Sequence, residues 1–342
     1  MAIKGILSLL AFGFSHQAAG WWILGCDKPV SIDRVDPIAS PGKLSHHLHT
    51  VMGGNAFDWA MDFNTTQTAN CTTCIVSKDL SNYWVPTVYF HDKNGSFVSV
   101  KQTGGANVYY QQRIDHTELE AGKSIQAFPK GFRMVAGDAN ARTWTDTREH
   151  KAIQFACLAP GESLPTFQGF PNRTCDSGLR LQVLFPSCWD GVNTDSDDHR
   201  SHVAYPSSID NGFCPDTHPV RLMFLMYEVT WAVDDFNHLR TDGDQPFVLS
   251  NGDATGYSYH GDFLNGWDTD VLTNAINNTS CGDSTRGDIH LCEVFKPYLL
   301  TDGQQNQCKS VPRKTREPVN GTIAKLPGCN PVTAEGDDVP SC

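Results

Sequence analysis

Short apolar segments with the composition of β-strands dominate this chain. The clearest of them occupy residues 83–91, 96–101, 152–158, 179–185, 221–231 and 246–249. The intervals between them are rich in glycine, proline, asparagine and aspartate, the residues that favour turns and loops. The pattern predicts a mainly β fold, either an antiparallel β-sandwich or a jelly-roll-like domain, with long loops and few short helices.

One connection between two predicted strands can be described in more detail. Residues 83–91 and 96–101 flank the turn sequence Asp92-Lys93-Asn94-Gly95. An Asn-Gly pair accepts a positive φ at low cost, which is what a tight turn between antiparallel strands requires. We therefore expect a β-hairpin at this position.

Two stretches have helical character, and the end of the chain has neither pattern. Residues 269–277 follow Asp268, whose carboxylate suits the N-cap of a helix, and residues 115–121 are long enough for one or two turns. Beyond about residue 300, charges, proline and glycine replace the apolar segments. Such a segment is too short and too polar to bury a core alone. We expect residues 301–342 to form a disulfide-tied tail packed on a main domain at residues 21–300.

The N-terminus has the pattern of a secretory signal peptide. Lys4 precedes an apolar run at residues 5–14, and the small residues Ala18 and Gly20 suit cleavage after residue 20. That run is too short to cross a bilayer, and no later stretch approaches the ~18 apolar residues of a membrane helix. We expect residues 1–20 to be removed and the protein to be secreted.

Charge and cysteine content agree with export and exclude some partners. The chain has 342 residues, 38 acidic against 26 basic side chains, a formal net charge of −12, and 12 cysteines. Nucleic acid and anionic membranes both attract basic surfaces, so neither is an expected partner. Twelve cysteines are too many for a reduced cytosolic protein and permit six disulfides, whose pairing the sequence does not give.

Seven N-glycosylation sequons also fit a secreted glycoprotein, and we expect some of them to be used. They begin at Asn64, Asn70, Asn94, Asn172, Asn277, Asn278 and Asn320. The motif Cys71-Thr72-Thr73-Cys74 has the spacing of half a zinc site or of a redox pair. Because no second motif of this spacing accompanies it, structural disulfides are the better interpretation.

Candidate chemistry begins with a histidine cluster. The segment Ser45-His46-His47-Leu48-His49 is followed by a glycine pair at residues 53 and 54. If the segment is extended, His47 and His49 lie on one face and His46 on the other. Two imidazoles on one face can bind a metal ion or position an anionic sugar group. Polar packing beside a turn is the alternative.

A second cluster places an acid and an imidazole beside aromatic rings. Asp190 follows Trp189, and His202 lies three residues before Tyr205, in the aromatic company on which sugar rings stack. The acidic residues at 195–198 between them lack the spacing of a calcium loop and are better interpreted as a solvated loop.

A carboxylate on the strand predicted at residues 221–231 is a third candidate. Glu228 stands near Tyr227 and Trp231, and apolar neighbours raise the pKa of a carboxyl group toward that of a general acid. A solvent-facing carboxylate on an edge strand is the equally simple alternative. The chain contains no Gly-x-Ser-x-Gly elbow, phosphate-binding loop, dinucleotide fingerprint or His-Glu-x-x-His helix.

The densest cluster lies at residues 256–268, which combine four aromatic residues with one histidine and two carboxylates. Aromatic rings such as that of Trp267 supply stacking platforms, and Asp262 with His260 can supply acid–base groups. Asp268 has a competing role as a helix N-cap, which we favour over catalysis.

Motifs from these clusters occur in one order along the chain. They are Asp36-Pro37-Ile38, Ser45-x-His47-x-His49, Gly131-Phe132-Arg133-Met134, Phe185-Pro186-x-Cys188-Trp189-Asp190-Gly191, Ser201-His202, Cys214-Pro215-x-x-His218-Pro219 and His260-Gly261-Asp262-Phe263. Together they resemble a family of secreted fungal proteins described as a domain of unknown function and sometimes joined to WSC carbohydrate-binding modules. The resemblance runs from about residue 36 to residue 330. It implies no established reaction, although the association with wall-binding modules implies a polysaccharide target. His46 is not part of the family's histidine element and ranks below His47 and His49.

The leading hypothesis is a secreted carbohydrate-active enzyme that cleaves glycosidic bonds of a cell-wall or extracellular polysaccharide by acid–base hydrolysis. The expected catalytic residues are Asp262, Glu228 and His260, with Asp190 in reserve. The expected substrate-binding residues are His47, His49, His202, Trp189, Tyr205 and Trp267.

Three other functions stay open. A polysaccharide lyase would use a histidine or tyrosine base on a uronate substrate, and a wall-binding protein would hold sugar without cleaving it. A copper or zinc ion bound by histidines is the third alternative, although the sequence itself requires no cofactor. The net acidity favours a neutral glycan over a strongly anionic one, so hydrolysis ranks ahead of elimination. We expect a monomer whose partner is polysaccharide.

Overall fold

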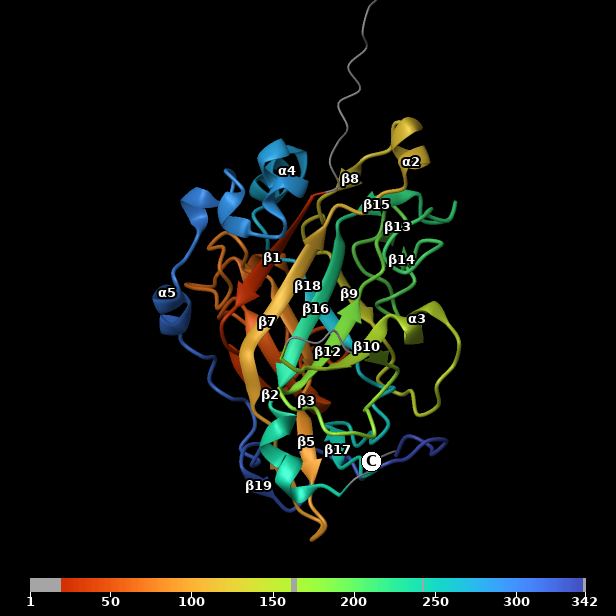
Figure 1. The fold of residues 1–342 in the computed structure, drawn as a ribbon. Coiled ribbons are helices and arrows are strands. Elements are labelled where there is room, and N and C mark those ends of the chain that lie inside the picture. Colours follow the sequence, from red (N-terminus) through yellow and green to blue (C-terminus); the bar gives the residue numbers. More distant parts are fainter. Residues whose placement is uncertain (1–19, 161–164, 242, 341–342) are drawn as a thin grey trace, which may run out of the picture.

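The computed structural model describes residues 20–160, 165–241 and 243–340 (Figure 1). Residues 1–19 of the predicted signal peptide lie outside the described residues, and so does Cys342. Strands account for most of the regular structure in the described part, and the helices are few and short. The predicted mainly β, antiparallel architecture is confirmed.

The largest sheet has six strands and is antiparallel throughout. In spatial order the strands are β1 (Trp21–Cys26), β7 (Gln102–Gln111), β16 (Phe224–Trp231), β12 (Leu179–Leu184), β10 (Ile153–Cys157) and β11 (Thr166–Phe167). In Figure 1, β7 and β16 are the long strands that cross the middle of the molecule.

The second sheet has five strands and carries most of the candidate site. Its order is β2 (Ser31–Val35), β3 (Leu44–Gly53), β4 (Asn82–Pro86), β18 (Gly261–Leu264) and β9 (Arg133–Ala136), again antiparallel.

Two small sheets and a few helices complete the fold. One sheet contains β17 (Phe247–Leu249), β5 (Val88–His91), β6 (Phe97–Ser99) and β19 (Thr322–Ile323), and the other contains β14 (Val203–Ala204), β13 (Cys188–Trp189), β15 (Val220–Leu222) and β8 (Ile125–Gln126). The α-helices of the described residues are α1 (Phe63–Thr66), α2 (His116–Glu120), α3 (Arg148–Lys151), α4 (Thr269–Asn277) and α5 (Asp302–Gln307), and the 3₁₀-helices are η1 (Val233–Leu239), η2 (Thr279–Cys281), η3 (Asp283–Thr285), η4 (Ile289–Leu291) and η5 (Lys296–Tyr298). Among the described residues no helix is long and apolar enough to cross a membrane.

Two neighbouring rows of residues distinguish the faces of the five-stranded sheet. Met52, Tyr83, Phe263 and Met134 are paired across four strands and belong to the main core between the two large sheets. In the next row, Val51, Trp84, Asp262 and Val135 are paired in the same way, and the apolar members belong to a separate cluster. Because side chains alternate along a strand, this second row lies on the outer face of the sheet.

Two predicted strands are each divided between two sheets. Residues 83–91 form β4 and β5 with a break at Thr87, because β4 pairs with β3 and β18 whereas β5 pairs with β17 and β6. Residues 221–231 belong to β15 and β16, because Met223 donates its N–H to Gln126 and so leaves the ladder of β16. In both places the apolar run predicts a strand correctly, but it does not reveal that the chain changes partners within it.

Other local predictions are confirmed. His91 pairs with Phe97 across the predicted hairpin, and Gly95 in its turn has φ 85°. Asp268 accepts the N–H of Val271 and caps α4. Five disulfides are present among the described residues, and Cys71 and Cys74 belong to two different ones, Cys71–Cys308 and Cys26–Cys74. The interpretation of Cys71 and Cys74 as structural cysteines is therefore confirmed.

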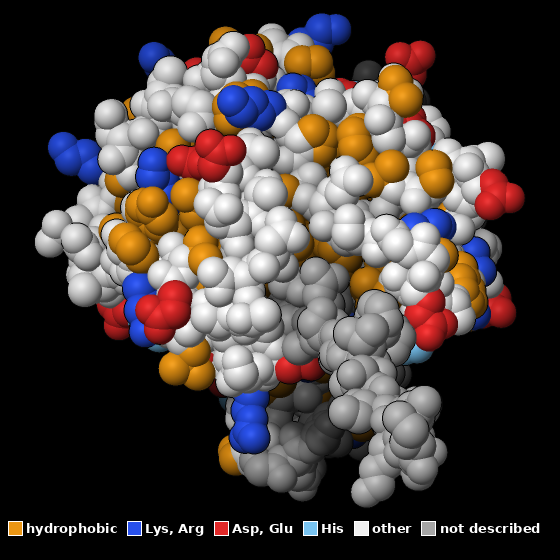
Figure 2. Space-filling model, turned by 90° about the horizontal axis from the view of Figure 1, so that it is seen from above, with side chains coloured by type: hydrophobic (Ala, Val, Ile, Leu, Met, Phe, Trp, Pro, Cys, Tyr) orange, Lys and Arg blue, Asp and Glu red, His pale blue; other side chains and the backbone are white. Residues whose placement is uncertain are grey.

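Charge is dispersed over the face that carries α2 and α4. Figure 2 looks down on this end of the molecule and shows acidic and basic side chains mostly standing singly among polar and hydrophobic ones. Where they are described, the residues of this face do not form the broad basic surface that nucleic acid requires.

Candidate histidine centre

Strand pairing brings three histidines from two segments together on the outer face of the five-stranded sheet. His49 on β3 pairs with Pro86 on β4, and β18 continues on the other side of β4, directly after His260. His47 lies two residues before His49 on the same face, and their ring centroids are 4.3 Å apart. The exposed His46 points the other way, as the alternation predicts. His47, His49 and His260 are called the histidine centre below.

The free ring nitrogens of the histidine centre face one another. His47 Nε2 lies 3.1 Å from His260 Nε2, and one nitrogen from each of the three rings falls within 4.8 Å of the others. The Nδ1 atoms of His260 and His49 lie 2.7 Å from the carbonyl oxygen of Ser258 and 3.2 Å from that of Val35. If each Nδ1–H donates to its carbonyl, both Nε2 atoms keep their lone pairs. His49 Nε2 is buried and has no hydrogen-bond partner.

Two buried carboxylates lie beside the histidine centre. Asp262 Oδ2 is 3.9 Å from His260 Nε2 and has no hydrogen-bond partner. Asp36 follows β2, accepts the backbone N–H groups of Ile38 and Ala39, and adds its charge to the surroundings of Asp262. Asp36 was not among the candidate residues of the sequence analysis. Its position in the motif Asp36-Pro37-Ile38 was the available signal.

Burial sets the protonation states of these groups. It lowers the pKa of His47 and His49 well below the ordinary histidine value and lowers the pKa of His260 to about 4. Burial, and then the like charge of Asp36, raise the pKa of Asp262 well above the usual carboxyl range. The imidazoles are therefore neutral at physiological pH, which is the form that binds metal ions.

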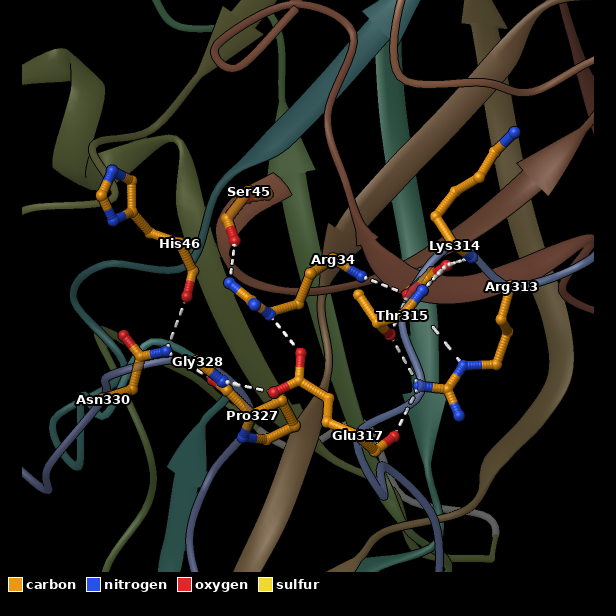
Figure 3. A network of polar contacts seen from close by, with 11 residues as sticks. Arg34, Ser45, His46, Arg313, Lys314, Thr315, Glu317, Pro327, Gly328 and Asn330 are labelled. Atoms are coloured by element: carbon orange, nitrogen blue, oxygen red, sulfur yellow. Dashed lines mark hydrogen bonds and ion pairs between the residues drawn. The ribbon is translucent and has the colours of Figure 1, made fainter. Parts of the chain in front are cut away.

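The C-terminal tail holds the start of β3, next to His47. Arg34 donates to the carbonyl oxygen of Ser45 and pairs with Glu317 of the tail, and Asn330 Nδ2 donates to the carbonyl oxygen of His46 at 2.8 Å (Figure 3). The N–H of Gly328 in turn donates to Glu317. A Cβ at Gly328, where φ is 78°, would stand 2.4 Å from the His46 carbonyl oxygen. The tail therefore packs too closely against β3 for a larger residue at this position.

A cleft of about 360 Å³ opens one strand away from Asp262. Its walls include Val135 and Gly137, and Val135 is the strand partner of Asp262. Arg148, Arg200 and Tyr205 line the rest of the cleft together with Pro186 and other residues. The cleft therefore borders the strand next to Asp262, although neither Asp262 nor the histidine centre is among its lining residues.

Glu228, expected to act with Asp262, lies elsewhere. Tyr227 points inward and its hydroxyl donates to the carbonyl oxygen of Asp262, so the neighbouring Glu228 faces outward from the six-stranded sheet. There it accepts hydrogen bonds from Tyr109 and Gln182 and lies 3.4 Å from Arg180. Two sheets separate Glu228 from Asp262, so these two carboxylates do not form a catalytic pair in one site.

The remaining predicted residues lie apart from one another, and three of them form local hydrogen bonds. Asp190 accepts the N–H groups of Val192 and Asn193 in a turn, and Trp189 donates to the carbonyl oxygen of Asn193. The ring nitrogens of His202 contact Ser196 Oγ and the carbonyl oxygen of Arg133.

The last two aromatic candidates differ in access. Tyr205 lines the cleft and donates its hydroxyl to the carbonyl oxygen of Leu184. Trp267 is completely buried in the main core, where its Nε1–H donates to Tyr110, so it offers no surface to a sugar ring. Of the predicted site residues, His47, His49, His260 and Asp262 come together, and Tyr205 lies beside the nearby cleft.

Comparison with known proteins gives a family without an assigned reaction. A family model described as "Domain of unknown function (DUF1996)" matches residues 36–267. The match covers more than half of the chain, and the chain belongs to this family. It ends before the tail, short of residue 330, to which the sequence resemblance extends. Neither a curated protein nor a solved structure matches the chain.

Proposed function

We propose that this DUF1996 protein is a secreted carbohydrate-active enzyme that depends on one transition-metal ion, zinc or copper, bound by His47, His49 and His260. One observation carries the metal site: three buried imidazole nitrogens converge, and one of them has no hydrogen-bond partner at all. Leaving a buried acceptor unsatisfied costs about 1–3 kcal/mol. A metal ion would satisfy all three nitrogens together.

The spacing and chemistry of the ligands suit such an ion. Tetrahedral nitrogen ligands at about 2.0–2.1 Å from zinc lie about 3.3 Å apart, and His47 Nε2 and His260 Nε2 are 3.1 Å apart. The hydrogen bonds to Ser258 and Val35 orient His260 and His49 as carbonyl partners orient metal ligands in general. Three protein ligands leave a fourth position open, the arrangement of catalytic rather than structural zinc.

Asp262 supplies the proton-transfer group of the proposal. Its Oδ2 atom lies 3.9 Å from His260 Nε2 with no hydrogen-bond partner, so it can hold or release a proton beside the histidine centre. A metal ion bound there would supply Lewis-acid chemistry and lower the pKa of water. Glu228 is too far away to complete a pair of carboxylates, and Asp36 is the second carboxylate near Asp262.

The polysaccharide part of the proposal rests on the sequence and on the cleft. The predicted signal peptide, the sequons and the five described disulfides support export to a compartment where wall polysaccharides occur. The cleft beside Asp262 contains Tyr205 and Pro186, whose rings can pack against sugar. Hydrolysis, elimination and binding without cleavage remain separable outcomes at this site.

Elemental analysis tests the metal site. The secreted protein is stripped with a chelator, reconstituted with zinc or copper, dialysed and analysed for metal per chain. We expect about one ion in the wild type and in His46→Ala, whose side chain lies on the opposite face of the same strand. We expect none in His47→Ala or His260→Ala. A folded wild type that retains neither metal contradicts the proposal, and so does a His47→Ala variant that binds as much as the wild type.

Product analysis tests the activity. The metal-loaded protein is incubated with glucans, mannans, galactans and uronate-containing polymers, and both released sugar and ultraviolet absorption by unsaturated ends are measured. Hydrolysis releases reducing ends without this absorption, whereas elimination produces it. Asp262→Asn should reduce either activity by several orders of magnitude while metal content is retained. No product from any polymer, with metal bound, contradicts the enzymatic proposal and leaves polysaccharide binding.

A further inference from the structure

The cleft beside the histidine centre has a charge opposite to that of the molecule as a whole. The chain carries a formal net charge of −12, but two arginines, Arg148 and Arg200, and only one acidic residue, Glu149, line this cleft. Its volume of about 360 Å³ lies within the range of about 300–1,000 Å³ that small-ligand sites occupy. A local excess of positive charge in an acidic protein points to an anionic ligand.

Arg200 is the arginine with unused binding capacity. Its Nε atom is buried without a hydrogen-bond partner, and within the described part of the chain its guanidinium forms no salt bridge. Arg148, by comparison, donates to the carbonyl oxygen of Ser207. A guanidinium presents a planar fork of donors that matches a carboxylate, and the unpaired Nε–H belongs to that fork.

The cleft adjoins the histidine centre directly. Val135 in its wall pairs with Asp262, and a Cβ on Gly137 would lie 2.9 Å from the Cα of His260. The wall of the cleft therefore includes the strand next to the one that carries Asp262.

We infer that this cleft binds a uronate unit of the polysaccharide, with Arg200 donating hydrogen bonds to its carboxylate while Tyr205 and Pro186 pack against the sugar ring. The inference rests on the proposed function and names its substrate class. It reverses the expectation from the net charge, which favours a neutral glycan. Net charge averages over the whole surface, whereas the ligand meets only the residues that line the cleft.

Calorimetric titration of the metal-loaded protein tests this inference. The ligands are trimers of galacturonate, glucuronate and mannuronate, each compared with the matching neutral trimer. We expect at least one uronate trimer to bind ten-fold or more tightly than its neutral counterpart, with the difference shrinking as salt is added. Equal affinity for charged and neutral trimers, or no binding of any trimer, overturns the inference from the wild-type protein alone.

Variants identify the residue responsible. Arg200→Gln should lower the ratio of the affinities for the uronate and neutral trimers at least ten-fold. Arg148→Gln should lower this ratio less. Arg173→Gln, which changes an exposed arginine outside the cleft, should bind like the wild type. A folded Arg200→Gln protein with unchanged preference overturns the assignment to Arg200. Metal content is measured on the same samples. Bound metal without uronate preference refutes this inference alone, whereas uronate preference without metal refutes the metal site alone.

Discussion

Two buried polar clusters lie on opposite faces of the five-stranded sheet, and they differ in how their hydrogen bonds are satisfied. On the inner face, Tyr83 donates to Asp79 and contacts the hydroxyl of Tyr110, which also accepts the Nε1–H of Trp267. On the outer face, the histidine centre and Asp262 leave a ring nitrogen and a carboxylate oxygen without partners. Both clusters are buried, so burial alone does not mark the site.

This difference shows which buried polar groups are free to bind a ligand. A cluster with every donor and acceptor matched strengthens the core and has nothing left to offer a ligand. In a cluster with unmatched lone pairs, each buried acceptor without a hydrogen bond destabilises the fold while no ligand is bound, and a bound ion can remove that cost. The inner cluster is therefore structural, and the outer cluster is the candidate site.

The largest effect is expected from truncating the inner cluster. Trp267→Ala removes a completely buried side chain and its hydrogen bond to Tyr110, which should lower the free energy of unfolding by about 3–5 kcal/mol. Urea denaturation measures this loss. Trp189→Ala, which changes a partly exposed ring, should cost less. A Trp267→Ala variant with near wild-type stability but lost sugar binding would instead make Trp267 a substrate contact and break the comparison.

The pH dependence of the inner cluster is the next largest effect. Burial raises the pKa of Asp79 to about 6 from 3.8, so the folded state holds a proton that the unfolded state releases. The stability from this group is fully present below pH 3.8 and is lost as the pH rises through about 6. A rise of about two pKa units corresponds to about 3 kcal/mol.

Replacing the carboxyl group isolates that contribution. The difference in unfolding free energy between Asp79→Asn and the wild type, measured by urea denaturation at pH 4 and pH 7, should shift by about 2.4 kcal/mol in favour of the variant at the higher pH. The contribution of His260 to stability changes with pH in the opposite direction. Because burial lowers the pKa of His260 to about 4, its contribution to the stability of the protein rises as the pH rises toward 6.5. Since His260 is present in both proteins, its slope cancels. Parallel curves for the two proteins would contradict the burial effect on Asp79.

The outer cluster should respond to metal instead. At a free zinc concentration 100 times the dissociation constant, binding stabilises the folded protein by about 2.7 kcal/mol. We expect this gain in the wild type and in His46→Ala but not in His47→Ala, as measured by thermal melting with zinc and with chelator. Removal of His47 should leave the stability of the metal-free protein nearly unchanged or higher. An equal zinc-induced gain in all three proteins would place the ion elsewhere.

The smallest effect concerns the tail that supports the outer cluster. Glu317→Gln weakens the partly exposed ion pair with Arg34, which holds the carbonyl oxygen of Ser45 near His47. Such pairs contribute up to about 1 kcal/mol, so zinc affinity should fall by no more than about five-fold in a chelator competition assay. Glu293→Gln, which removes the exposed pair with Lys296, should have no effect. Complete loss of zinc from Glu317→Gln would show that the tail positions His47 much more strongly than this ion pair predicts.

Local features of the fold were predictable because their causes are local. The turn around Gly95 depends on backbone freedom, the start of α4 depends on the capping side chain of Asp268, and the strand runs depend on residue type. The breaks at Thr87 and Met223 were not predictable, because each depends on which distant strand offers the next hydrogen-bonding partner.

The candidate site was predictable in part. Alternation along an extended segment placed His47 and His49 on one face, and the density of functional groups singled out His260 and Asp262. Alternation could not tell which face of its sheet Glu228 occupies, nor that Trp267 lies in the core. Asp36 was marked only by the motif Asp36-Pro37-Ile38, and Arg200 follows the acidic residues that were interpreted as a solvated loop, so neither was identified as a site residue.

By itself, the sequence determined the strand-rich composition, the structural role of the cysteines and the placement of His47 and His49 on one face, because period-two alternation and residue chemistry act over a few residues. Only the tertiary structure decided that His260 joins them across β4, that Glu228 stands two sheets away, and that two arginines line the neighbouring cleft. Those relations depend on strand order and register, which are fixed by contacts between residues far apart in the chain.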